Sequence, residues 1–172
     1  MNSSKIESLI AEQVLLAKLF AKPFSKAFAE QTVLQKLKNL DRDCLDYPWE
    51  EKQWESFFES QMGRCLLFQL RGANDESMQG FVLFHLNPWE RQAHLLKIAL
   101  KPELRGGGGA GMLFEAGKNW LKRNNYSQIY LEASAANQRA LGFYKKNNFT
   151  RLCVKKRFYS DGQDAVALLL TL

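Results

Sequence analysis

The chain has 172 residues, of which 46% are hydrophobic and 24% charged, so length and composition predict one soluble globular domain. The net charge of +6 favours anionic partners such as phosphates, cofactor nucleotides or RNA, but the longest basic run is only Lys155-Lys156-Arg157. Three widely spaced cysteines without a Cys-x-x-Cys pair argue against disulfides and zinc, and no window reaches the ~20 apolar residues of a membrane span. We therefore expect a cytoplasmic protein that binds neither metal nor membrane. We interpret the cysteines and both histidines, His85 and His94, as structural.

The N-terminal third of the chain is predicted to be helical. Residues 4–21 place apolar side chains at helical spacing, and Pro23 ends the pattern. Residues 30–42 repeat this spacing, and a turn at Pro48 precedes a helix whose aromatic residues share one face: Trp54, Phe57 and Phe58. We expect residues 1–25 to be a helical extension that packs on a main domain of residues 26–172. Binding of the extension to a membrane surface or a partner is the alternative.

The rest of the chain alternates strands and helices. Residues 64–70 and 78–86 are apolar runs around the polar "RGANDES", a pattern typical of a hairpin. Further elements are expected in this order: a strand over 92–100 ended by Pro102, a helix from the glycines to about Asn124, a strand over 127–133, a helix from Asn137 to Lys146, and two long strands over 149–159 and 165–172 joined by the tight turn "SDGQD". In the strand over 127–133, Tyr130 and Glu132 face away from Ile129, Leu131 and Ala133. The pattern predicts a mixed α/β protein.

The stretch "LRGGGGAGML" (104–113) contains Gly106-x-Gly108-x-x-Gly111, the spacing of a dinucleotide-binding loop, with Glu132 placed as its ribose ligand. A nicotinamide site needs the strand to run directly into the first glycine, and here "KPELR" intervenes. A P-loop is excluded because no Gly-Lys-Ser/Thr follows. The run opens a helix, so we expect it to bind a diphosphate through main-chain N–H groups, with Arg105 as a neighbouring cation.

Several motifs resemble one known family. The run from Arg105 to Ala110 is similar to the Arg/Gln-x-x-Gly-x-Gly/Ala acetyl-CoA motif of the GNAT N-acetyltransferases, and residues 129–149 resemble the strand, Asn-bearing turn and Tyr-bearing helix of that family. Within the family, "YPWEEKQWESF" (47–57), the spacing from Leu131 to Tyr144 and "RFYSDGQDAVALLL" (157–170) resemble the RimI-type ribosomal-protein alanine N-acetyltransferases. The resemblance covers about residues 30–172. The chain departs from the family pattern in its extra glycines, in Ser134-Ala135-Ala136, which lacks a common arginine, and in Asn148, which replaces a glycine.

The resemblance implies a GNAT fold, with a mostly antiparallel sheet of about six to seven strands, about four flanking helices and the extra N-terminal helix. It implies acetyl-CoA as cofactor, with Glu132 as base, acting through water, and Tyr144 as acid for the sulfur. The cofactor would contact these residues: Ile98, Ala99, Leu100, Arg105, Gly106, Gly107, Gly108, Gly109, Ala110, Gly111 and Asn137. Pro48, Trp49 and Tyr159 would flank the acceptor, although a core role for Trp49 is the alternative.

The expected activity is acetylation of a protein N-terminus, most naturally that of a ribosomal protein. Apolar neighbours of Glu132 predict a raised pKa, which suits a base near neutral pH. Two alternatives stay open: an acetyltransferase for a small amine, and a non-catalytic CoA-binding or RNA-associated basic domain. No strand signature of an RNA-recognition motif is present, so we expect no direct nucleic-acid binding, and we expect a monomer or weak dimer.

Overall fold

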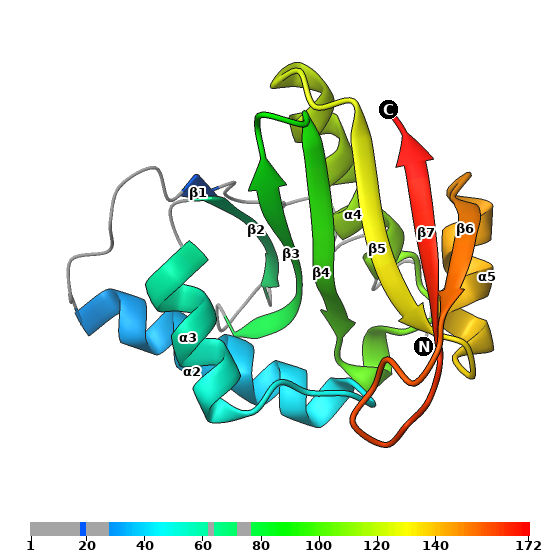
Figure 1. Ribbon diagram of the computed structural model, residues 1–172. Coiled ribbons are helices and arrows are strands. Elements are labelled where there is room, and N and C mark those ends of the chain that lie inside the picture. The colour runs from blue at the N-terminus through cyan, green and yellow to red at the C-terminus, as the bar shows by residue number, and fades with distance from the viewer. Residues whose placement is uncertain (1–17, 20–27, 62–63, 72–76) are drawn as a thin grey trace.

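The computed structural model describes residues 18–19, 28–61, 64–71 and 77–172, which form one twisted sheet with helices on both faces (Figure 1). The sheet has the strand order β1-β2-β3-β4-β5-β7-β6. Its strands are β1 (Lys18–Leu19), β2 (Cys65–Arg71), β3 (Met78–Asn87), β4 (Gln92–Leu100), β5 (Gln128–Ser134), β6 (Thr150–Lys155) and β7 (Ala165–Thr171). The predicted mixed α/β architecture with a mostly antiparallel sheet is confirmed.

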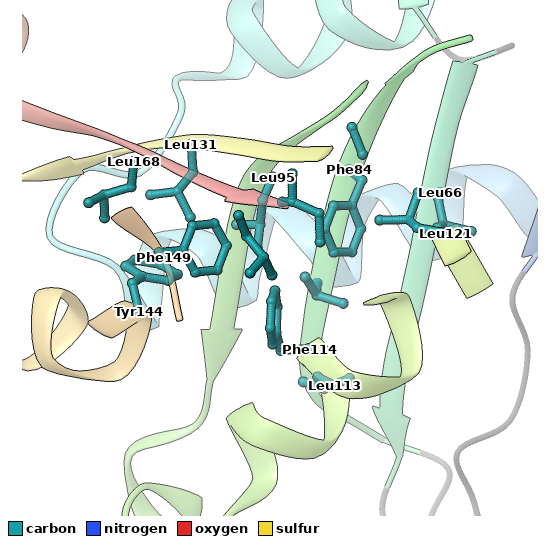
Figure 2. Packing of buried hydrophobic residues seen from close by; sticks show 14 of the residues in the cluster. Leu66, Phe84, Leu95, Leu113, Phe114, Leu121, Leu131, Tyr144, Phe149 and Leu168 are labelled. Carbon is teal, nitrogen blue, oxygen red and sulfur yellow. The ribbon is translucent and has the colours of Figure 1, made fainter. Parts of the chain in front are cut away.

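Two pairs of helices cover the sheet, each over its own apolar cluster. α2 (Phe28–Cys44) and α3 (Glu51–Gln61) pack against β2, β3 and β4 on one face, through the cluster that includes Leu37, Trp54 and Phe81. α4 (Gly109–Arg123) and α5 (Gln138–Lys146) cover the other face. Figure 2 shows the cluster beneath them, where Phe114, Tyr144 and Phe149 meet residues of several strands. None of the described helices is both long and apolar enough to cross a membrane.

The sheet is split in its middle, between β4 and β5. These strands pair in parallel over only three residue pairs, Gln92–His94 with Gln128–Tyr130, whereas every other neighbouring pair of described strands is antiparallel. Beyond His94 and Tyr130 the two strands diverge (Figure 1). The C-terminal half of β4 therefore has a strand partner on one side only, and we call its unpaired edge, where it faces β5, the slot.

The alternation predicted for the strand over 127–133 is confirmed. Ile129, Leu131 and Ala133 are buried, and Tyr130 and Glu132 lie on the opposite face. The predicted hairpin of β2 and β3 and the capping of α5 by Asn137 are also confirmed.

Two expectations about secondary structure differ from the model. Most of the helix expected over 4–21 lies outside the described residues, but Lys18–Leu19 form a strand that pairs with Leu66 and Leu67 of β2. The strand expected over 149–159 ends at Lys155, because the chain turns at Arg157, which has φ +52° and whose N–H donates to the Asp164 carboxylate. The division of the chain near residue 25 stays a prediction, since residues 20–27 lie outside the described part.

Candidate active site

The glycine run forms a turn that leads directly into α4. Gly106 and Gly108 have φ of +84° and +89°, a left-handed backbone that side chains with a Cβ rarely adopt. Gly109 packs tightly, because a Cβ there would lie 2.8 Å from Leu100 Cδ2. Gly108 is the N-cap of α4 and contributes no side chain to cap it, so the first N–H groups of the helix stay open for a ligand. The turn therefore presents main-chain N–H groups at the start of α4, where the sequence predicts a diphosphate cradle.

The open edge of β4 offers a second set of main-chain groups. The N–H of Lys101 donates to Gln79 O of β3, and residues that alternate along a strand direct their main-chain groups to opposite edges. Ala99 therefore faces β3 with its main chain, whereas Ile98 and Leu100 face the slot. A ligand extended along the slot would meet the main chain of Ile98 and the N–H of Leu100 as it would meet a neighbouring strand, whereas the carbonyl of Leu100 already accepts a hydrogen bond from Arg105.

Two other residues assigned to the cofactor already have protein partners. The Arg105 guanidinium donates to Leu100 O at 3.2 Å and to Cys44 O at 2.7 Å, so it joins the glycine turn to β4 and to the end of α2. Asn137 Oδ1 accepts the N–H of Ala140 at 2.9 Å and caps α5, and its Nδ2 reaches Asp46 at 3.4 Å. Both residues thus shape the ends of the slot in this structure.

Glu132 lies where the split begins, two residues beyond Tyr130, the last residue of β5 that pairs with β4. Its side chain is 10% exposed and has three hydrogen-bonding partners. Lys155 Nζ donates to Oε1 at 2.6 Å, and the Tyr130 hydroxyl donates to the same oxygen at 2.8 Å. His94 Nε2 lies 2.7 Å from Oε2. We call Glu132, His94, Tyr130 and Lys155 the carboxylate network.

The expectation of a raised pKa for Glu132 was wrong. Burial does raise the pKa of this carboxyl, but hydrogen bonds from His94, Lys155 and Tyr130 outweigh burial and lower it to about 2. The same contacts with Glu132 and Tyr130 raise the pKa of Lys155. The apolar alternation of β5 indicated burial, but it gave no sign of a cation arriving from β6. Glu132 is therefore an ionised carboxylate over the whole working pH range.

Tyr144 lies on α5, with its ring in the aromatic cluster beneath that helix (Figure 2). It is 6% exposed, and burial raises the pKa of its hydroxyl well above the usual value. Within the described part of the chain, no residue forms a hydrogen bond with this hydroxyl. Tyr159 does link Glu132 and Tyr144 electrostatically: burial, Tyr47 and Glu132 together raise the pKa of Tyr159 to about 12, and Tyr159 adds to the effect of burial in raising the pKa of Tyr144.

Two loops meet on the side of the sheet that carries the carboxylate network. Residues 45–50, which we call the acceptor loop, connect α2 to α3, and residues 156–164 connect β6 to β7. Tyr47 stacks on Tyr159 with ring centroids 4.0 Å apart, and its hydroxyl donates to Asp161 at 3.1 Å. Trp49 points instead into the α2–α3 cluster, against Trp54 and Phe57, and Pro48 is exposed.

Three residues of this region were not predicted from the sequence to belong to the site: His94, Lys155 and Tyr47. His94 alternates with buried residues of β4, which is why its apolar surroundings favoured a structural interpretation. Lys155 belonged to a basic run that is typical of a solvated face. Tyr47 lies beside the proline and tryptophan that carried the resemblance. These residues reach the site through contacts between segments that are distant in sequence, and a single sequence does not reveal such contacts.

The arrangement combines groups that acyl transfer to an amine requires. Main-chain donors line the slot, a fixed carboxylate with an imidazole lies at its apex, and a buried hydroxyl lies on the α5 side. The imidazole can take up a proton, and the hydroxyl can donate one.

Comparison with known proteins places the chain in a family. The sequence profile described as "Acetyltransferase (GNAT) family" matches residues 34–149. An N-alpha-acetyltransferase of Saccharolobus solfataricus is 40% identical over 76 residues, which is 44% of this chain and 46% of that protein. The [ribosomal protein bS18]-alanine N-acetyltransferase of Escherichia coli is 27% identical over 144 residues, 82% of this chain and 93% of that protein. The match thus spans about half the length of the archaeal relative.

Solved structures show the same fold. The ribosomal-protein-S18-alanine N-acetyltransferase of Escherichia coli superposes with a TM-score of 0.71 at 24% identity, over 87% of this chain and 91% of that one. A chain of the NatC complex bound to Gag peptide and CoA gives a TM-score of 0.69 at 24% identity, over 88% and 96%. With the split sheet, the glycine turn at α4 and a profile that matches more than half of its residues, this chain belongs to the GNAT acetyltransferase family.

Proposed function

We propose that this protein transfers an acetyl group from acetyl-CoA to the α-amino group at the N-terminus of a protein. The observation that carries the proposal is the carboxylate network at the apex of the split between β4 and β5, next to an open strand edge. It places a proton-accepting pair of side chains beside the slot for an extended acyl donor. The names of the bacterial and archaeal relatives support a protein N-terminus as the acceptor.

The residues of the slot fit acetyl-CoA. The open N–H groups after Gly108 would hold its diphosphate, favoured by the dipole of α4. A Cβ built on Gly106 or Gly108 meets no atom within 4 Å, so the space above the turn is open. Ile98 and Leu100 would pair with the amide-containing arm. Acetyl-CoA would supply the acetyl group as a thioester, whose sulfur departs as a thiol.

The proton of the acceptor amine goes to the Glu132–His94 pair. Glu132 is ionised and therefore only accepts hydrogen bonds, so the His94 nitrogen at 2.7 Å is the donor, Nε2–H. This tautomer leaves Nδ1 of His94 as an acceptor, and no hydrogen bond within the described part of the chain involves it. Glu132, with a pKa of about 2, is a weak base, but its hydrogen bond orients the imidazole. The proton thus leaves the amine for His94 Nδ1, directly or through water.

Tyr144 supplies the second proton. Its hydroxyl is buried, keeps its proton because burial raises its pKa, and lacks a hydrogen-bonding partner among the described residues. Such a group gains a partner when a thiolate forms beside it, so it would protonate the departing sulfur. Asn137 fixes the start of the helix that carries this tyrosine.

The test is an acetylation assay with a panel of acceptors. The protein is incubated with acetyl-CoA and short peptides that begin with Ala, Ser or Met, with one lysine peptide blocked at its N-terminus, and with polyamines. Mass spectrometry detects an added acetyl group of about 42 dalton, and fragmentation locates it. We expect acetylation of the α-amine. Acetylation confined to lysine or polyamines would favour the small-amine alternative and overturn the proposed acceptor.

A thermal-shift measurement tests the cofactor separately. Acetyl-CoA should raise the melting temperature, since a ligand that binds only the folded state stabilises it by mass action. NAD serves as the matched control because it also carries a diphosphate. Stabilisation by NAD without stabilisation by acetyl-CoA would contradict the cofactor assignment.

A further inference from the structure

A buried ion pair lies outside the proposed chemistry. Lys97 Nζ of β4 donates to Asp41 Oδ1 of α2 at 2.8 Å, and the two side chains are 4% and 0% exposed. The other carboxylate oxygen of Asp41 accepts the main-chain N–H of Trp49 at 2.8 Å and Trp54 Nε1–H at 3.0 Å. Both carboxylate oxygens therefore have partners from three different segments of the chain.

Stability alone does not account for this pair. Burying two charges costs about as much as their attraction returns, and well-packed apolar residues in their place are often neutral or stabilising. Burial lowers the pKa of Lys97 even though Asp41 raises it. The pair instead fixes local geometry, because each buried charge requires its partner at one position.

The segment whose geometry the pair fixes is the acceptor loop. Lys97 Nζ also donates to the carbonyl of Tyr47 at 3.3 Å and lies 4.7 Å from the ring centroid of Trp49. Asp41 holds the N–H of the same Trp49. The pair therefore binds the acceptor loop at residues 47 and 49.

An irregularity in β4 places Lys97 there. The register with β3 shifts between Leu83 and Phe84, so that Leu96 of β4 has no opposite residue. As a result Leu96 and Lys97, although consecutive, both lie on the side of α2 and α3. The next residue, Ile98, returns to the other side and to the slot. Because of the bulge, two consecutive residues of β4 serve different regions: Lys97 contacts the acceptor loop, and Ile98 faces the slot that would hold acetyl-CoA.

The acceptor loop in turn reaches across the split. Tyr47 stacks on Tyr159 and binds Asp161, and Asp46 contacts Asn137 at the start of α5. Tyr159 lies within electrostatic range of Glu132 and Tyr144, the two proposed catalytic residues. A continuous set of contacts therefore runs from Lys97 to the region where the acceptor would bind.

We propose that the Asp41–Lys97 ion pair is a clamp that positions the acceptor loop, so that Tyr47 and Tyr159 form the wall against which the acceptor binds. Lys97 and Asp41 are positioning residues in this role and touch neither substrate. The inference rests on the proposed function for the identity of the acceptor, and on the contacts alone for the clamp.

The test variant removes both charges together. Asp41→Asn with Lys97→Met keeps an amide oxygen for the two tryptophan N–H groups and an unbranched apolar chain in place of the lysine, so no buried charge is left unpaired. The control is Lys38→Met, which removes the ion pair between Lys38 of α2 and Glu51, the first residue of α3, and leaves every contact of Asp41 and Lys97 in place. If the double variant does not fold, Tyr47→Leu at the half-buried surface tests the last contact of the clamp.

Two measurements separate the clamp from the proposed function. Hydrogen–deuterium exchange of residues 45–50 should rise in the double variant and not in Lys38→Met. The KM for the peptide acceptor should rise about tenfold, with kcat and the KM for acetyl-CoA within about twofold of wild type. Unchanged exchange in the loop overturns the clamp, whatever the enzyme acetylates. Faster exchange with an unchanged peptide KM overturns its role in acceptor binding. A wild-type protein that acetylates no peptide contradicts the proposed function, and the exchange measurement still decides on the clamp.

Discussion

The two sides of the split between β4 and β5 are built from different parts of the chain. On the side proposed to bind the cofactor, the groups that would act belong to the main chain: the turn at Gly106 and Gly108, the first N–H groups of α4 and the open edge of β4. On the side proposed to bind the acceptor, they belong to charged and aromatic side chains, such as the carboxylate network and the Asp41–Lys97 pair. We therefore expect added side-chain atoms to impair the cofactor side, and the loss of charges or hydroxyl groups to impair the acceptor side.

The largest expected effect concerns Tyr144. Tyr144→Phe should lower kcat about 10²-fold or more, the usual contribution of a general acid, with little change in stability because the lost hydroxyl has no partner in the described part of the chain. Steady-state kinetics and a melting curve check both statements. Tyr126→Phe, which alters a tyrosine packed on Trp120, is the control and should keep full activity. Full activity of Tyr144→Phe would remove Tyr144 from the mechanism.

The next effect is the dependence of stability on pH through Glu132. Its pKa is lowered from 4.5 to about 2, so its contribution to stability is fully present above pH 4.5 and is lost as pH falls toward 2. Wild type should exceed Glu132→Gln in free energy of unfolding by about 3 kcal/mol near neutral pH, and the difference should vanish near pH 2. Urea denaturation at several pH values measures it. Glu115→Gln, at a more exposed ion pair with Lys118, should show little such dependence.

An added methyl group should damage the cofactor side through α4. A Cβ on Gly117 would lie 2.5 Å from Phe84 Cε2, so Gly117→Ala should destabilise the fold by about 1–3 kcal/mol. Gly142→Ala in α5 meets open space and should instead stabilise it by up to about 1 kcal/mol, the gain in helix propensity. Chemical denaturation compares the two variants. Equal effects would mean that close packing of α4 on β3 is unimportant.

The smallest expected effect lies in the glycine turn itself. Gly108→Ala forces a Cβ into a left-handed backbone at a cost of about 1 kcal/mol, although the space is open, whereas Gly111→Ala on the same helix should cost nothing. Calorimetry with acetyl-CoA should show weaker binding for Gly108→Ala and unchanged binding for Gly111→Ala. If both variants bound acetyl-CoA more weakly, a clash of the added methyl groups with the ligand would explain the result, and backbone strain at Gly108 would not.

The same contrast explains what the sequence predicts well. A main-chain site depends on neighbours in sequence, so the glycines, the helix they open and the capping by Asn137 were all visible in one short stretch. The periodicity of residues 127–133 likewise placed Glu132 on the correct face. These features follow from local backbone preferences.

The acceptor side depends on long-range pairing that periodicity does not reveal. Lys97 and Asp41 are 56 residues apart and meet because a bulge at Leu96 reverses the alternation of β4. Lys155 reaches Glu132 from β6, across the intervening strand β7, and its hydrogen bond acts with those of His94 and Tyr130 to reverse the pKa shift expected from burial. One chain without an alignment carries no signal for either contact.

The three-pair seam between β4 and β5 has a further consequence. Unpaired strand edges are sites where sheets of different molecules join and aggregate, and most proteins place charges or bulges on them. Here the unpaired edge with Ile98 and Leu100 lies inside the sheet, recessed between two half-sheets that stay joined at Gln92–His94. The unpaired edge therefore lies in the interior of the sheet, between β4 and β5, and not at the rim, where strands of other molecules add to a sheet. The short seam thus separates this edge from the place where sheets of different molecules join.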